Sequence, residues 1–192
     1  QMANELTAGG HTAAVYNEAV NGQDIDYFIS NFATQVTPHL DATDGVRNIV
    51  IMLETAIYVD DTLGSMGTGL SLSDPTAAGV ANYDKHVSWS QTAKAASARW
   101  HPGAVRAPDL VEPSTYADEA ANALYRQARD HSYTLMGGNS TDFFRVINVR
   151  ARPEFSDPWS LTYYQNAGNG ERIHLVDAGY DLLGQLLASG VL

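Results

Sequence analysis

The spacing of apolar residues changes once along this sequence, near residue 143. Before that point apolar residues recur every three or four positions, as in amphipathic helices, and after it they alternate with polar residues, as in half-buried strands. Helices followed by strands, with no long crossover between the strands, favour an α+β fold with antiparallel pairing. We therefore predict a mainly helical body of about five or six helices over residues 1–140. A small C-terminal three-stranded antiparallel sheet and a terminal helix are predicted over residues 141–192.

The size and composition fit one globular domain. The chain has 192 residues, of which 44% are hydrophobic and 17% are charged. A chain of this length and composition buries a substantial core without covalent staples. It contains no Cys, which excludes disulfides, thiolate metal sites and cysteine nucleophiles. We therefore predict a single domain over residues 1–192.

Six segments have the spacing and the terminal residues of helices. Asp24 is a good N-cap for the second segment, and Pro38 ends it. The third segment has apolar residues on more than one stripe, so we place it at the centre of the core. Residues 64–82 are predicted as a long loop because Gly, Ser and Thr are frequent there. The predicted helices cover residues 11–21, 25–36, 46–63, 83–100, 115–136 and 179–192.

The strands are predicted from alternation and from one turn sequence. Residues 143–152 alternate in polarity, and Pro153 ends them. Residues 161–164 and 172–176 flank the sequence Ala-Gly-Asn-Gly at 167–170, which is typical of a hairpin. The three strands therefore make up the predicted C-terminal sheet.

The charge of the chain restricts its partners. The formal net charge is −11, and nearly all of the excess lies in residues 1–142. Nucleic acids and anionic membranes need a positive surface, so we predict neither as a partner. No apolar run is long enough for membrane insertion. A protein partner or self-association is the remaining expectation.

The first residues bear on where the protein is made. No basic stretch precedes an apolar run, so we predict no signal peptide and synthesis in the cytoplasm. Gln1 precedes Met2, which fits a residue left by a tag. The alternative is a secreted protein whose mature chain begins at Gln1.

One loop contains residue types that bind metals. His39, Asp41 and Asp44 are acceptable ligands for Zn, Fe or Mn. Their spacing matches no known ligand motif, and the alternative is a surface His and a helix cap. We therefore predict no bound metal and no cofactor, with these three residues as the candidate ligands if a metal binds.

Three residues are candidates for acid–base catalysis. Glu54 lies on the most apolar predicted helix, and carboxylates beside apolar surface can serve as general acids. His101 and His131 complete the candidate catalytic set. The alternative is that Glu54 belongs to an ordinary solvated stripe.

Two Arg-containing groups are candidates for binding. Arg99, Trp100 and His101 suit an anion, an aromatic ligand or a protein contact. Arg150 and Arg152 would project from one face of the first predicted strand and suit an acidic partner. The alternatives are that Trp100 packs a helix end and that the Arg pair lines a solvated sheet face.

No catalytic motif accompanies these candidates. The sequence has neither G-x-S-x-G nor a phosphate-binding glycine loop, and it points to no known family. An acidic helical body with a long loop and an Arg-lined sheet suits attachment to other proteins. We therefore predict a non-enzymatic structural or assembly subunit, such as a virus or phage particle contains. Its complex should weaken as the salt concentration rises.

Two alternatives remain open. A small hydrolase-like enzyme would need a hollow in which polar side chains converge, with candidates at His39, Glu54, Arg99, His101 and His131. A small-ligand binding protein would need an apolar cavity lined by Tyr and Trp.

Overall fold

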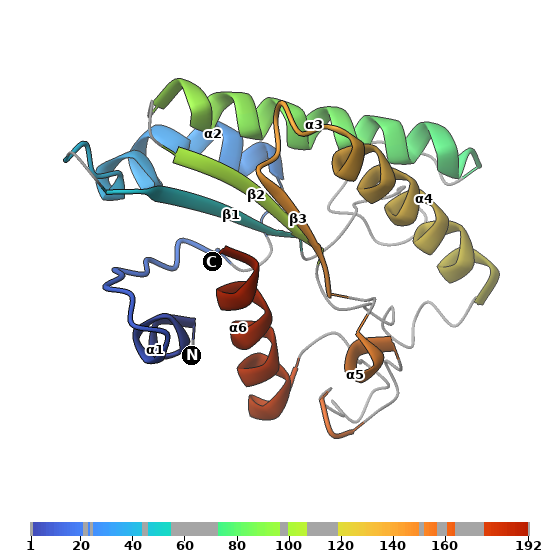
Figure 1. Cartoon of the computed structure of the whole chain (residues 1–192). Coiled ribbons are helices and arrows are strands. Elements are labelled where there is room, and N and C mark those ends of the chain that lie inside the picture. The colour runs from blue at the N-terminus through green and yellow to red at the C-terminus, as the bar shows by residue number, and fades with distance from the viewer. Residues whose placement is uncertain are drawn as a thin grey trace.

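The computed structural model describes residues 2–20, 23, 25–43, 46–54, 73–96, 100–106, 119–149, 152–156, 161–163 and 175–191 (Figure 1). Its helices are α1 (Met2–Ala8), α2 (Ile25–Gln35), the short 3-10 helix η1 (Thr37–His39), α3 (Pro75–Ala96), α4 (Glu119–Gly138), α5 (Pro153–Ser156) and α6 (Asp177–Val191). Its strands are β1 (Asn48–Glu54), β2 (Trp100–Arg106) and β3 (Arg145–Asn148). The mainly helical character predicted from the sequence is confirmed. No helix in these ranges is both long and apolar enough to cross a membrane.

β1 occupies the segment that the spacing assigned to a central helix. Residues 49–51 are Ile, Val and Ile, and β-branched residues in an unbroken apolar run are typical of a strand buried on both faces. Periodicity alone does not separate such a strand from a buried helix. The helix predicted over residues 46–63 is therefore wrong in its described part, and residues 55–63 lie outside the described ranges.

The three strands form one parallel sheet in the order β1-β2-β3. Parallel strands need crossover connections, and α3 and α4 lie in the two crossovers. Each crossover moves one strand along in the same direction, and both helices lie on the same face of the sheet (Figure 1). The topology is a consecutive β-α-β-α-β unit.

The predicted antiparallel sheet is wrong in its pairing and in its position. Among the described residues, β3 is the one strand that coincides with a predicted strand, and it pairs in parallel with β2. Residues 161–163 form turns, and Leu175 is in an isolated bridge. Residues 164–174, which include the predicted hairpin turn, lie outside the described ranges. The prediction failed because β1 and β2 were not recognised as strands, so β3 was given neighbours that are close in sequence.

One face of the sheet packs against α2, α3 and α4. Val50 and Met52 of β1 contact a buried cluster that includes Phe32 of α2 and Trp89 of α3. Val146 of β3 contacts a second cluster, formed by residues of α3, α4 and the turn after α4. Because side chains alternate between the faces of a strand, these residues define one side of the sheet.

The other face packs against α6. Ile51 of β1 and Ile147 of β3 contact a buried cluster that includes Phe155 and Leu183. α1 lies against α6 on this side of the molecule, and its Leu6 is buried (Figure 1). The first and last helices of the chain therefore form the second layer together.

α3 begins earlier than its apolar spacing suggested. Asp74 caps the helix, since its Oδ1 accepts a hydrogen bond from the Ala77 backbone N–H at 3.0 Å, and Pro75 is the first helical residue. Ser, Thr, Asn or Asp before Pro is a typical helix start. The loop predicted over residues 64–82 is therefore wrong from residue 75 onwards, while residues 64–72 lie outside the described ranges. The signal was missed because α3 buries polar residues such as Asn82 and Ser90 and shows almost no apolar stripe.

α3 and α4 approach each other closely along their length. A Cβ atom added to Gly79 of α3 would lie 2.6 Å from the Ala128 carbonyl oxygen and 2.9 Å from the His131 Cβ. Asn82 Nδ2 donates a hydrogen bond to Ser132 Oγ at 2.8 Å within this contact. The helices can come this close because the residues between them are small.

We expect Gly79→Ala to destabilise the protein by about 2 kcal/mol, because overpacking against a backbone oxygen forces the helices apart. Gly137→Ala in α4 is the matched control, since an added Cβ there meets nothing within 4 Å. That control should be neutral or stabilising by up to about 1 kcal/mol. Urea denaturation of the two variants measures the difference. Equal stabilities would contradict the close contact.

Candidate functional site

Residues 11–20 form an exposed segment without regular structure, which we call the arm. The helix predicted over residues 11–21 is therefore wrong. A helix of this length is marginal in water unless it packs against something. Three apolar side chains of the arm face solvent instead, with exposed fractions of 40% for Val15, 57% for Tyr16 and 38% for Val20.

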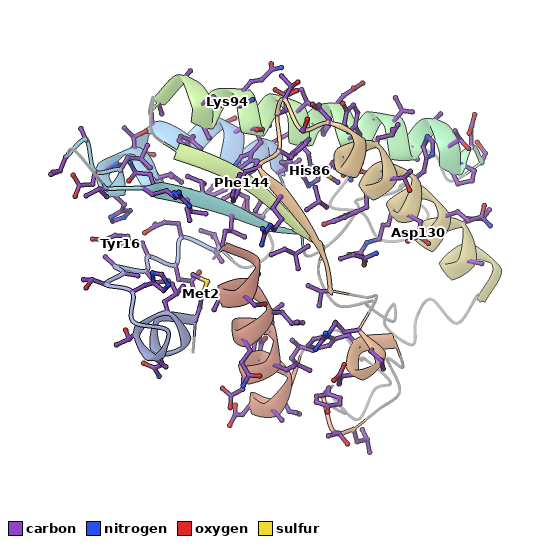
Figure 2. The ribbon with its side chains drawn as sticks, viewed as in Figure 1. Met2, Tyr16, His86, Lys94, Asp130 and Phe144 are labelled. Carbon is purple, nitrogen blue, oxygen red and sulfur yellow. The ribbon has the colours of Figure 1, made fainter. Side chains whose placement is uncertain are left out.

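One cluster attaches the arm to the body, and we call Tyr16, Glu18 and His39 the clasp. The rings of Tyr16 and His39 stack with centroids 4.1 Å apart. His39 Nε2 lies 2.9 Å from Glu18 Oε1. η1 holds His39 in place, and Pro38 sets the turn of this short helix. Figure 2 shows Tyr16 on the side of α1, away from His86 and Asp130. The clasp therefore fixes the arm to the segment just before β1.

Asp41 organises the turn that follows the clasp. Its Oδ1 accepts a hydrogen bond from the Thr43 backbone N–H at 2.7 Å. Its backbone N–H donates to Asn48 Oδ1 at 2.8 Å. Hydrogen bonds from the side chain and backbone of Thr43 lower the pKa of Asp41. The carboxylate thus stabilises a local turn.

The candidate metal ligands do not converge in the described part of the chain. His39 is engaged by Glu18, and Asp41 by Thr43. Asp44 lies outside the described ranges. Within those ranges, no group of three or more His, Asp or Glu side chains is placed to hold a metal ion.

The carboxyl ends of the three strands bring together Glu54, Arg106 and Asn148, which we call the edge row. Glu54 is the register partner of Arg106, and Arg106 is the partner of Asn148. Neighbouring strands lie about 4.8 Å apart, so the three positions span one short line across the sheet. In open α/β sheets, ligands bind beyond the carboxyl ends of the strands where the strand order reverses, and the described order β1-β2-β3 has no reversal.

The candidate catalytic residues lie apart. His101 pairs with Ile49 near the start of the sheet, whereas Glu54 pairs with Arg106 at its end. Five residues of strand separate these positions, roughly 16 Å at about 3.3 Å per residue. His131 lies on α4 beside Gly79, in the contact between the two crossover helices. The backbone therefore does not gather Glu54, His101 and His131 into one site.

The candidate binding residues are also dispersed. Trp100 begins β2, at the amino end of the sheet, and Arg99 lies outside the described ranges. β3 ends at Asn148, so the prediction that Arg150 and Arg152 share a strand face is wrong. Arg152 lies in the turn before α5, where its Nε is 3.9 Å from Glu154 Oε2. Arg150 lies outside the described ranges.

Arg145, which was not among the candidates, has a clear structural role. Its Nη1 donates a hydrogen bond to the Gly190 carbonyl oxygen at 2.7 Å, at the C-terminal end of α6. A cation at this end of a helix satisfies a terminal carbonyl and complements the helix dipole. Arg145 therefore joins β3 to the last helix.

Buried polar residues of α3 and α4 were not predicted from the sequence. His86, Ser90, Arg129 and Ser132 are almost completely buried. His86 Nδ1 lies 2.8 Å from the Asn82 carbonyl oxygen one turn earlier. The spacing of small residues on α4 was the available signal that this face is buried.

A polar network closes the turn between α4 and β3. Lys94 Nζ of α3 lies 3.2 Å from Asp142 Oδ1 and also donates to the Thr141 carbonyl oxygen. Asn139 Nδ2 donates to Asp142 Oδ2 at 2.8 Å and to the Tyr83 hydroxyl at 2.8 Å. Burial raises the pKa of Asp142, but the hydrogen bonds from Asn139 and Lys94, with the positive charge of Lys94, outweigh it and lower the pKa overall.

The lowered pKa of Asp142 predicts a loss of stability in acid. The contribution is complete above the unfolded-state pKa of about 3.9 and disappears as the pH falls through the lower folded-state pKa. We expect Asp142→Asn to cost about 2 kcal/mol at pH 7, because charge-assisted hydrogen bonds are lost. Its stability should also fall less steeply below pH ~4 than that of the parent. Asp84→Asn on the exposed side of α3 is the control, and identical acid profiles for the parent and Asp142→Asn would contradict the assignment.

Comparison of the chain with protein-family models, with curated proteins and with solved structures gave no match in any of the three. The function must therefore be inferred from the residues of this chain and their geometry. Two features offer a contact with another molecule: the arm with its clasp, and the edge row.

Proposed function

We propose that the protein is a subunit of a protein assembly and that it joins this assembly through the arm. The observation that carries the proposal is the exposure of Val15, Tyr16 and Val20 on an extended segment. A segment outside regular secondary structure that offers neighbouring apolar side chains is suited to dock on a second protein. A virus or phage particle is one assembly that such a subunit would serve.

The clasp supports this role. An arm without attachment would lose much conformational entropy on binding, and that loss would weaken the contact. The stacked ring of Tyr16 and the close contact between the Glu18 carboxylate and the imidazole of His39 hold the middle of the arm in one conformation. Val15 and Val20, on either side of it, are therefore presented to a partner in a partly organised segment.

The first experiment measures self-association of the parent chain and of the double variant V15S/V20S by sedimentation over a range of concentrations. Burying a fully exposed Val side chain contributes about 1.5 kcal/mol, so Val15 and Val20, each about two-fifths exposed, contribute roughly 0.6 kcal/mol each. Losing both contacts should raise the dissociation constant roughly tenfold. The clasp residues are unchanged in this variant.

The matched control is V46S/V80S, which removes two Val side chains with exposed fractions of 38% and 39% outside the arm. It should associate like the parent chain. A strict monomer at every concentration would contradict the proposal. Equal weakening by both double variants would show that the contact does not depend on the arm.

The edge row supports a second candidate function, the binding or turnover of a small anionic molecule. Arg offers a fork of donors that fits phosphate or carboxylate, Asn adds a donor, and Glu can accept a proton. Glu54, Arg106 and Asn148 occupy adjacent register positions at the carboxyl ends of the three strands. This second candidate site contains Glu54 of the predicted catalytic set, but its neighbours are Arg106 and Asn148 and not His101 and His131.

Inorganic phosphate is the probe for this second candidate. Phosphate that binds the folded chain should raise its melting temperature, as any ligand of the native state does. Arg106→Ala should abolish the rise. Arg47→Ala is the control, because Arg47 is exposed just before β1, at the amino ends of the strands. An unchanged melting temperature in the parent, or a full rise in R106A, would exclude an anion site at the edge row.

A further inference from the structure

Residues 2–20, comprising α1 and the arm, form what we call the N-terminal segment. Described contacts attach it to the body at two places. α1 packs on α6 with Leu6 buried, and the clasp stacks Tyr16 on His39. Between these places the arm is exposed and without regular structure. The segment is thus attached at two points separated by several exposed residues.

α1 has a defined shape but depends on α6 for its stability. It ends in a Schellman motif, in which the His11 N–H donates to the Leu6 carbonyl oxygen at 3.0 Å and the Gly10 N–H donates to that of Thr7 at 2.9 Å. Gly10 has a φ of 82°, the conformation that this motif requires and that Gly adopts without strain. A seven-residue helix does not persist alone in water, so α1 needs an α6 to pack on.

The hydrogen bonds described for the arm are local. The Ala19 N–H donates to Asn17 Oδ1, and the Gln23 N–H donates to the Val20 carbonyl oxygen. A fully extended chain spans about 3.3–3.6 Å per residue, so the seven residue steps from Glu18 of the clasp to Ile25 of α2 reach roughly 24 Å. This stretch is the connection that would lead the N-terminal segment from its own body to a neighbouring copy.

We propose that two copies of this chain exchange their N-terminal segments, so that α1 and the arm of each copy dock on α6 and His39 of the other. This inference rests on the proposed function and names its partner as a second copy. Exchange re-forms the same contacts between chains that the closed chain makes within itself, which is why segment exchange is a low-cost route to dimers. The α6 surface and His39 are the docking sites.

Burial of the exposed side chains of the arm favours the exchanged dimer over the closed chain. In the closed chain, Val15 and Val20 remain in water. In an exchanged dimer both arms pass between the two bodies, where these side chains become buried. Burial of this apolar surface stabilises the exchanged dimer, in addition to the contacts that the closed and exchanged forms share.

The charge of the chain predicts how salt affects the exchange. Each copy has a formal net charge of −11, so two copies repel each other and added salt screens the repulsion. The exchanged dimer should therefore strengthen as the salt concentration rises. A contact built from complementary charges, as the composition first suggested, would weaken instead.

The test uses single cysteines in the full chain, which has no Cys of its own. Tyr16→Cys and His39→Cys are prepared separately, mixed at a concentration where the parent chain associates, and treated with dibromobimane, which joins two thiols that lie close together. Exchange predicts a covalent dimer that contains one copy of each variant. The control mixture pairs Tyr16→Cys with Thr134→Cys, on the exposed surface of α4, and should give no such dimer.

The double variant Y16C/H39C reports the closed form, because its two thiols then join within one chain. Dimers in solution that give no mixed covalent product, with the double variant crosslinked only within chains, would overturn the exchange while leaving the assembly role intact. A monomer at every concentration would overturn both. Circular dichroism of each variant verifies folding, and dimer formation that rises with salt in the parent is the second, mutation-free readout.

Discussion

The close approach of α3 to α4 is the constraint on which the rest of the structure depends. Both helices cross over the same face of a three-stranded sheet, so they must share a narrow surface. They fit because Gly79, which has no side chain, lies against the Ala128 carbonyl oxygen, and because Asn82 donates a hydrogen bond to Ser132. Larger side chains at these positions would push one helix off its strand. The polar network around Asp142 then fixes where α4 ends and where β3 begins.

The sequence predicted helices better than strands, and the reasons are physical. α2, α4 and α6 have an apolar stripe and recognisable ends, so their spacing identified them. β1 has apolar residues on both faces, because the sheet is covered on both sides, and this pattern also fits a buried helix. β2 contains Pro102 and Gly103, which usually indicate a break in structure. Without these two strands, the pairing of β3 could not be predicted.

The candidate sites show the same difference between local and long-range information. His39 was singled out as a candidate metal ligand, but its partners Tyr16 and Glu18 lie more than twenty residues away, and no local motif indicates them. Glu54 was also singled out, yet its neighbours Arg106 and Asn148 follow only from the strand register. Arg129 and His86 were missed because burial of a polar side chain depends on what packs over it. Residue types could be read from the sequence, whereas their groupings required the fold.

The order of the layers has a consequence for how this protein is synthesised. One face of the sheet is covered by helices from the middle of the chain, but the other face waits for α6, which comes last. Ile51 and Ile147 therefore lack this covering helix until α6 has been synthesised. α1 precedes α6 in the chain and has no α6 to dock on during that time. A nascent chain with this order of elements keeps α1 unattached until α6 is made, so neighbouring nascent chains on one polysome are where such segments would first meet.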